Sequence, residues 1–195
     1  MAPYLKYSEE RMNYSRLVQV VTHVVTEGLR EIFKQEWDNR YKIDLGEWKD
    51  TPDDGKNFCT ILRRQPRGIN PYLLKTIEKG NRAEWDCSML CYAILNCDSP
   101  DNRNLRIKSN VGDLRDLRNE LVHWPTVEIS NEYFRTKISK IKNAFHELGL
   151  REPEIPGPEI GFSPEEFIAA LEELGDIKKK VEELEKKFVR KLTTF

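Results

Sequence analysis

The stretch NVGDLRDLRNELVH, residues 110–123, decides the fold of this chain. Its apolar residues recur three and four positions apart, the spacing of one buried face of an α-helix. Asn110 is a suitable N-cap for such a helix, and Pro125 ends it because proline lacks the backbone N–H that a helix interior uses. We therefore predict a helix whose buried stripe consists of Leu114, Leu117, Leu121 and Val122.

The rest of the chain up to residue 150 carries frequent helix signals and few strand signals. Further helices are predicted over about residues 9–37, 70–80, 85–96 and 131–148, and a β-branched run at 18–26 weakens the first of them locally. Their capping and stop residues are Asn70, Pro71, Gly80, Ser130 or Asn131, and Gly149. Residues 44–67 read as a long ordered loop with one short helix at most. The pattern predicts an all-α, antiparallel up-and-down helical bundle.

The chain divides into three parts by composition. Residues 1–150 form the predicted bundle, and residues 151–162 contain three prolines and two glycines, which is typical of a linker. Residues 163–195 begin with a capping box at Ser163 and continue as an amphipathic C-terminal helix. This extra helix can pack back on the bundle, pair with a second chain as a coiled coil, or begin a further module of a larger parent protein. We favour the last two.

The composition is that of a soluble chain with balanced charge. The 32 basic and 33 acidic residues give a net charge of -1, which argues against a wholly basic, nucleic-acid-coating protein but leaves room for a local basic groove. No apolar run approaches the roughly 20 residues that cross a bilayer, so we expect no membrane association. The cysteines show no disulfide framework, which favours a reducing compartment, the cytoplasm.

Three of the four cysteines, Cys87, Cys91 and Cys97, cluster in the segment 85–97. Cys87 and Cys91 are one turn apart, a spacing that would suit a shared metal ion. However, there is no C-x-x-C pair and no nearby histidine to complete a structural zinc site. Leu90 and Ile94 share the same face, so we interpret the thiols as core residues and expect neither a metal nor a cofactor.

The end of the 110–123 helix places Arg118, Asn119 and His123 within a turn and a half. Asn119 and His123 share a helix face, and the long Arg118 side chain can reach it. An arginine can hold a phosphodiester and a histidine can transfer its protons, as metal-free RNA cleavage requires. An ordinary helix end is the alternative, with Arg118 paired to Asp113, Glu120 or an acidic group on another helix, and His123 favoured by the helix dipole. For the short pattern alone, this alternative is the stronger.

Resemblance along most of the chain changes that balance. Trp85-Asp86 with its apolar helix, the run from Gly112 through Arg118-Asn119-Glu120 to His123, and the last bundle helix together resemble a HEPN domain. Within that superfamily the chain is most similar to the branch named after the DAZ-interacting ubiquitin ligase. The resemblance covers about residues 10–150, and it implies a helical bundle that dimerises with its R-N-x-x-x-H helices facing each other.

The resemblance also implies roles for the motif residues. Arg118 corresponds to the arginine that holds the scissile phosphate, and His123 to the histidine that acts as general acid or base. Asn119 corresponds to the polar residue that orients them. Since each chain contributes one motif histidine, a composite site would need a homodimer. The implied activity is a metal-independent endoribonuclease for single-stranded RNA, and the alternative is a non-catalytic dimerisation, RNA-binding or adaptor module of an innate-immune or ubiquitin-signalling protein.

Two groups of cations are candidates for RNA contacts. One group precedes the predicted motif helix and the other lies in the predicted loop, so either could line a cleft if the chain folds it over the motif. Such groups of cations are, however, more often part of an ordinary solvated surface than RNA contacts. The six residues are Arg103, Arg106, Lys108, Arg63, Arg64 and Arg67.

Overall fold

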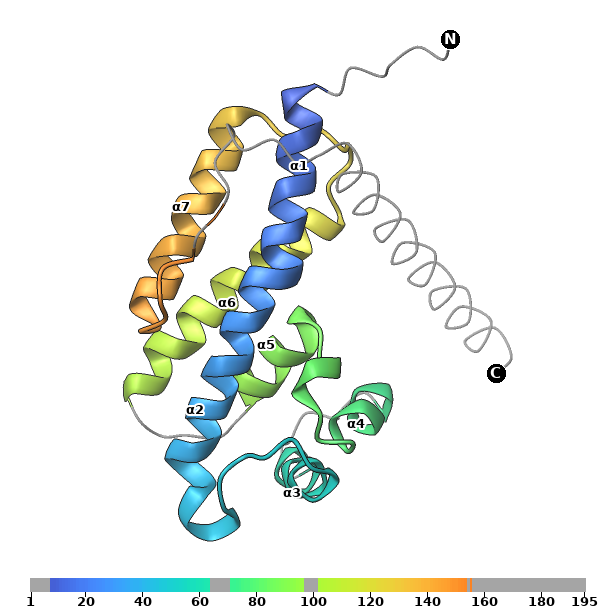
Figure 1. Ribbon diagram of the computed structural model, residues 1–195, viewed down its shortest axis with the longest axis vertical. Helices are drawn as coiled ribbons and strands as arrows, with labels where there is room; N and C mark the ends of the chain where they lie inside the picture. Colours follow the sequence, from blue (N-terminus) through green and yellow to red (C-terminus); the bar gives the residue numbers. More distant parts are fainter. Residues whose placement is uncertain (1–7, 64–70, 97–101, 154, 156–195) are drawn as a thin grey trace, which may run out of the picture.

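The computed structural model describes residues 8–63, 71–96, 102–153 and 155, and all regular structure in these ranges is helical (Figure 1). The all-α class is therefore confirmed for the described chain. No helix among the described residues is long and apolar enough to span a membrane. The predicted C-terminal helix at 163–195 and most of the linker at 151–162 lie outside the described residues.

A helical rod runs from Glu9 to Leu45 along the length of the molecule (Figure 1). It consists of α1 (Glu9–Gln19), a π-helical segment η1 (Val20–Val25) and α2 (Thr26–Leu45). The π segment falls in the β-branched run, where branched side chains crowd the preceding turn and weaken α-helical bonding. The Thr26 hydroxyl donates to the carbonyl of Val21 at 3.1 Å. The rod continues eight residues beyond the predicted end at Trp37.

The predicted loop at 44–67 contains one helix, as the sequence allowed, but with 11 residues α3 (Pro52–Leu62) is longer than the short helix expected there. Its start is a capping box in which the Thr51 hydroxyl accepts from the Asp54 N–H and the Asp54 carboxylate accepts from the Thr51 N–H. Pro52 occupies the first turn, where its missing N–H costs nothing. The signal was present as Thr51-Pro52-Asp53-Asp54, but the abundance of Asp, Gly and Pro around it favoured a loop.

Short helices connect α3 to the centre of the fold. These are α4 (Pro71–Ile77), the 3-10 turn η2 (Arg82–Glu84) and α5 (Cys87–Asn96). Trp85 stands before α5 rather than inside it, and the Asp86 carboxylate accepts from the Met89 N–H at 2.8 Å at the start of the helix. Trp85 packs edge-on against Phe33 with ring centroids 5.0 Å apart, so this junction anchors the chain to α2. The same aromatic cluster includes Trp37, Trp48 and Phe58.

Helix α6 (Asn102–Val122) begins eight residues before the predicted N-cap. Asn110 lies in its interior, where its side-chain amide donates to the Arg106 carbonyl at 2.9 Å. Asn110 therefore reads locally as a cap, but the preceding turn continues the helix. The last helix, α7 (Asn131–Glu147), confirms the prediction closely: the Ser130 hydroxyl accepts from the Tyr133 N–H at its start, and Gly149 follows its end.

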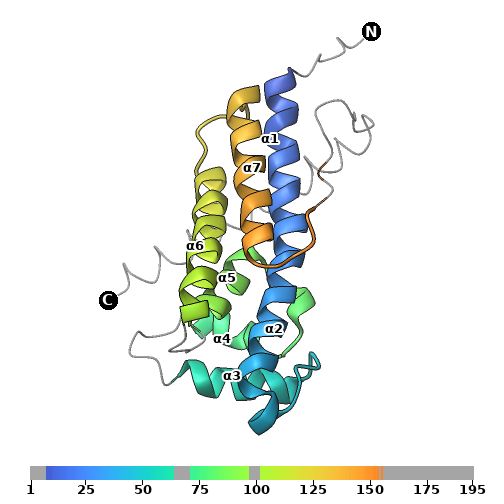
Figure 2. The same cartoon turned by 90° about the vertical axis from the view of Figure 1, so that its left-hand side faces the viewer.

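The helices are not all antiparallel to their neighbours. Helix α6 carries the chain back to the start of α1, where the Ile129 N–H donates to the Glu10 carbonyl at 2.9 Å. Helix α7 starts there, and Asn13 donates to Asn131 at 2.6 Å. Because α7 then ends beside Gly28, it is parallel to the rod and antiparallel to α6 (Figures 1 and 2). The antiparallel order expected from the sequence thus holds for α6 and α7 but not for α1 and α7.

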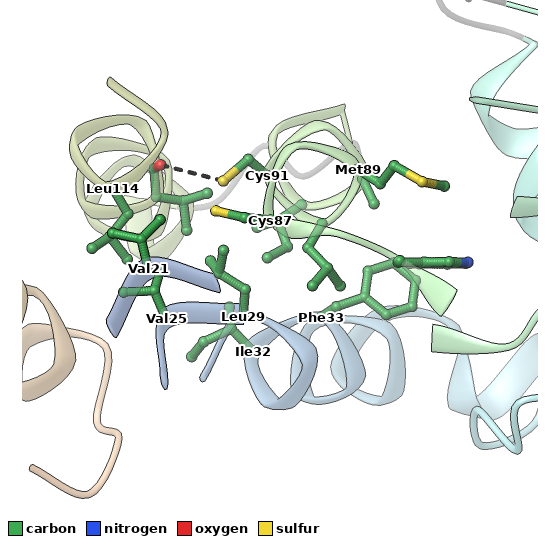
Figure 3. Packing of buried hydrophobic residues seen from close by; sticks show 14 of the residues in the cluster. Val21, Val25, Leu29, Ile32, Phe33, Cys87, Met89, Cys91 and Leu114 are labelled. Atoms are coloured by element: carbon green, nitrogen blue, oxygen red, sulfur yellow. Dashed lines mark hydrogen bonds between the residues drawn. The ribbon is translucent and has the colours of Figure 1, made fainter. Parts of the chain in front are cut away.

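The cysteines of α5 are part of the central core (Figure 3). Cys87 and Cys91 are buried beside Val21, Val25 and Leu29, and the Cys91 thiol donates weakly to the Val111 carbonyl at 3.9 Å. The core interpretation is confirmed for Cys87 and Cys91, and Cys59, for which no such prediction was made, is buried as well. Cys97 lies outside the described residues.

A partly buried ion pair between Asp50 and Arg82 connects the loop after α2 to η2. It makes the stability of the fold depend on pH. Burial by itself raises the pKa of Asp50, but hydrogen bonds from Arg82 and from the Trp48 indole outweigh it and lower the pKa to about 2. A carboxylate with a lowered pKa stabilises the fold above its unfolded value of about 4, and this contribution is lost as the pH falls towards 2.

Asp50→Asn tests this link. Asn tolerates the positive φ of 58° at this position, so the change removes charge with little backbone strain. We expect the wild type to have the higher unfolding midpoint at pH 5, and the difference to shrink between about pH 4 and 2. Thermal unfolding followed by circular dichroism measures it. A difference that is constant over this range would contradict the assignment.

Candidate functional site

The motif residues project from the last turn and a half of α6. Leu117 and Leu121 face the core at 6% and 4% exposure, so the neighbouring positions face outwards. Arg118 is half-buried, whereas Asn119 and His123 are exposed. All three predicted site residues thus lie within a turn and a half at the end of α6, and Arg118 contacts Asn119 there.

Within this group, Arg118 is held by Asn119 rather than by an acid. Its Nη1 donates to Asn119 Oδ1 at 3.2 Å, and it forms no ion pair with any described residue. The backbone N–H of His123 donates to the Asn119 carbonyl at 3.2 Å and continues the helical bonding by one residue. The His123 side chain makes no hydrogen bond within the described part of the chain. Both groups are thus accessible to an anion from outside.

The ordinary helix-end interpretation needs an acidic partner for Arg118. Glu120, one of the candidates, is paired with a different residue in the structure. Glu120 forms an ion pair with Lys137 of α7. Burial by itself raises the pKa of Glu120, but the bond from Lys137 outweighs it and lowers the pKa. Lys137 also lies over the ring of Tyr133, 4.7 Å from its centroid. The charge of the Glu120 carboxylate is therefore balanced by Lys137 and not by Arg118.

The turn after the motif is anchored by aromatic packing. The rings of Trp124 and Tyr133 have centroids 4.6 Å apart, and the Trp124 indole donates to the Glu128 carbonyl at 3.1 Å. Together with the Glu120–Lys137 pair, these contacts fix the end of α6 against α7. Sequence reasoning noticed Trp124 but missed Tyr133 and Lys137, because both lie on the next helix and no local signal connects them to the motif.

The cations predicted to bind RNA are dispersed. Arg63 caps the end of α3, a helix that lies well apart from the end of α6 (Figures 1 and 2). Arg106 lies near Glu147 of α7 at 3.7 Å, and its position on α6 is about 25 Å from that of His123 at 1.5 Å per residue. Lys108 is half-buried on α6, and Arg103 is in the same helix. Arg64 and Arg67 lie outside the described residues.

One hollow next to α6 does not include Arg118, Asn119 or His123 in its lining. It is a groove of about 310 Å³ between α6 and α7. Its apolar floor includes Leu114 and Ile141, and its charged rim consists of Asp113, Asp116, Glu120, Lys137 and Lys140. Among the described residues there is no group of three or more side chains with metal-ligating chemistry.

The chain was compared with protein-family models, curated proteins and solved structures, and none of them matches it. What the site can do therefore has to be argued from its own groups. An exposed guanidinium offers a planar fork of donors that suits a phosphate, and an exposed imidazole can accept or donate a proton near neutral pH. The two groups are on one helix end, which suits chemistry at a phosphodiester.

Proposed function

We propose that this chain is a HEPN-like up-and-down bundle that cleaves single-stranded RNA as a dimer, without a metal ion. The observation that carries the proposal is the exposed end of α6, where Arg118 is not neutralised by any described acid and lies with Asn119 and His123. The reaction class comes from the resemblance of the sequence to HEPN domains, since none of the proteins compared with the chain matches it.

The reaction needs only groups that this surface offers. A base removes the proton from a ribose 2′-hydroxyl, whose oxygen attacks the adjacent phosphorus. The P–O5′ bond breaks, an acid protonates the departing 5′-oxygen, and the products are a 2′,3′-cyclic phosphate and a 5′-hydroxyl. Arg118 would offset the charge that grows on the phosphoryl oxygens, and His123 would transfer a proton.

One chain carries half of this machinery. The base and the acid act on opposite sides of the phosphorus, and each chain contributes one motif histidine, His123. Two chains that place their α6 ends together would supply two imidazoles and two guanidinium groups to one substrate. The outward direction of Arg118, Asn119 and His123 supports such an arrangement, because a partner can approach without moving the bundle.

The test is cleavage of unmodified single-stranded RNA by the full chain in excess EDTA. We expect products with cyclic phosphate ends, and a specific activity that rises with protein concentration until the dimer saturates. Light scattering on the same samples gives the dimerisation range. Activity that disappears with the chelator, or that is the same in samples shown to be monomeric, would overturn the proposal.

A second candidate is a non-catalytic dimerisation or adaptor module. It is favoured by the side chain of His123, which no described residue orients, whereas a catalytic histidine is commonly held by a hydrogen bond. A chain that dimerises in solution but leaves RNA intact in both EDTA and Mg²⁺ would support this candidate over the nuclease.

A further inference from the structure

The charges on α6 are separated between its two sides. At 100° per residue, Asp113, Asp116 and Glu120 fall within about 60° of one another. All three line the groove towards α7. The cations Lys108, Arg115 and Arg118 lie on the other side of the helix. Lys108 and Arg115 therefore form a positive sector of the helix surface beside the acidic sector.

The three cations form a row along the helix, which we call the α6 ladder: Lys108, Arg115 and Arg118. Lys108 and Arg115 differ by about 20° around the axis, Arg118 lies about 60° from Arg115, and the row spans about 15 Å along the helix. Around the axis, Lys108 and Arg115 lie about 60° and 80° from His123, and Arg118 lies about 140° from it. The row ends beside Asn119, about one turn before His123.

The ladder is available to a ligand. Lys108 and Arg118 are half-buried and form no ion pair with a described residue. Arg115 Nη2 lies 3.2 Å from Asp116 Oδ1, but the side chains are 48% and 69% exposed. An exposed pair of this kind contributes little in water, so a phosphate can compete for the guanidinium. Arg106, by contrast, faces α7 and pairs there with Glu147.

We propose that the α6 ladder binds successive phosphates of a single-stranded RNA and leads the strand along α6 to His123. This inference rests on the proposed function for its substrate class and adds Arg115, which sequence reasoning did not select. A row of cations about 15 Å long is longer than one phosphate group, so it suits a polyanionic strand rather than a small anion. It also replaces Arg63 and Arg106 as the expected contacts.

The test measures binding separately from cleavage. The probe is a 2′-O-methyl oligouridylate of about 12 nucleotides, which lacks the attacking hydroxyl and stays intact. Its affinity for the full chain is measured by fluorescence anisotropy at several salt concentrations. Each phosphate contact on a single strand contributes about 0.7 to the slope of log affinity against log salt. Lys108→Ala and Arg115→Ala are each expected to flatten the slope by this amount and to weaken binding about fivefold at 0.1 M salt.

Lys140→Ala is the matched control, since Lys140 is an exposed cation on α7 that lines the acidic groove instead. It is expected to leave both the affinity and the slope unchanged. The ladder is wrong if Lys108→Ala and Arg115→Ala bind like the wild type, or if Lys140→Ala weakens binding as much as they do. Polyglutamate of matched charge serves as competitor, and if it binds as tightly as the oligonucleotide, the surface recognises an acidic protein segment rather than RNA.

Cleavage of unmodified RNA, measured in parallel, separates this inference from the proposed function. Binding that depends on Lys108 and Arg115 without any cleavage would keep the ladder and reject the nuclease. Cleavage that is unaffected by Lys108→Ala and Arg115→Ala at limiting RNA would keep the nuclease and reject the ladder.

Discussion

His123→Ala is expected to lower the rate of RNA cleavage by about 10²–10⁴-fold, the usual contribution of a positioned proton-transfer group. The imidazole is exposed at the end of α6 and contacts no described side chain through a hydrogen bond, so its removal leaves no buried group unpaired. The substitution should therefore change the unfolding midpoint little. Single-turnover cleavage at saturating protein measures the chemical step, and anisotropy with the 2′-O-methyl probe shows that binding persists.

The chain offers a matched control for this prediction. His146 is an exposed histidine on α7, and His146→Ala removes the same side chain from a surface away from the motif. It should cleave RNA at the wild-type rate. Arg118→Ala should also abolish cleavage. In addition it should weaken binding of the probe, because the guanidinium both binds the phosphate and stabilises the charge that develops on it. Cleavage that survives both His123→Ala and Arg118→Ala would show that the activity arises elsewhere or from a contaminant.

Gly80→Ala is expected to destabilise the fold by about 2–5 kcal/mol, from backbone strain of about 1–2 and overpacking of about 1–3. Gly80 has a φ of 75°, and a Cβ placed on it would lie 1.8 Å from the carbonyl oxygen of Thr51. That oxygen belongs to the residue that caps α3 and accepts from the Gly55 N–H at 3.1 Å. The added methyl group must push the start of α3 away from the turn after α4.

Gly149→Ala separates the two contributions. Gly149 has a nearly equal φ of 71°, but a Cβ there would meet nothing within 4 Å. It should cost about 1 kcal/mol from backbone strain alone. Urea unfolding of both variants gives the difference, which isolates the steric contribution. Equal losses in the two proteins would mean that the contact between Gly80 and Thr51 contributes nothing. If Gly80→Ala does not fold, Gly80→Asn, which tolerates positive φ but keeps the Cβ, should fail as well.

Local signals were sufficient wherever a helix is bounded by its own residues. The last helix was predicted almost to the residue, since Ser130 caps it, apolar residues recur at 3–4 spacing and Gly149 follows it. The burial of Cys87 and Cys91 followed from their apolar neighbours on the same helix face. In these cases the deciding interactions lie within one or two turns.

Local signals misled where distant packing decides the structure. Asn110 looks like a cap, yet α6 starts at Asn102. The many Asp residues around α3 made its sequence look like a loop. In the structure, Phe58 of α3 is fully buried in an aromatic cluster with Phe33 and Trp85, which come from elsewhere in the chain. Burial in that cluster stabilises a helix that its composition alone does not favour. The candidate cations show the same limit, since Arg63 and His123 prove to be far apart.

The sequence by itself determined that this protein is all helical, that its core includes the α5 thiols, and that Arg118, Asn119 and His123 share one helix end, because each depends on spacing within a single helix. Only the tertiary structure decided which charges meet. It pairs Glu120 with Lys137 and Arg106 with Glu147 of α7, whereas no described acid pairs with Arg118. Such pairings depend on how helices pack, and packing brings together residues that no local pattern connects.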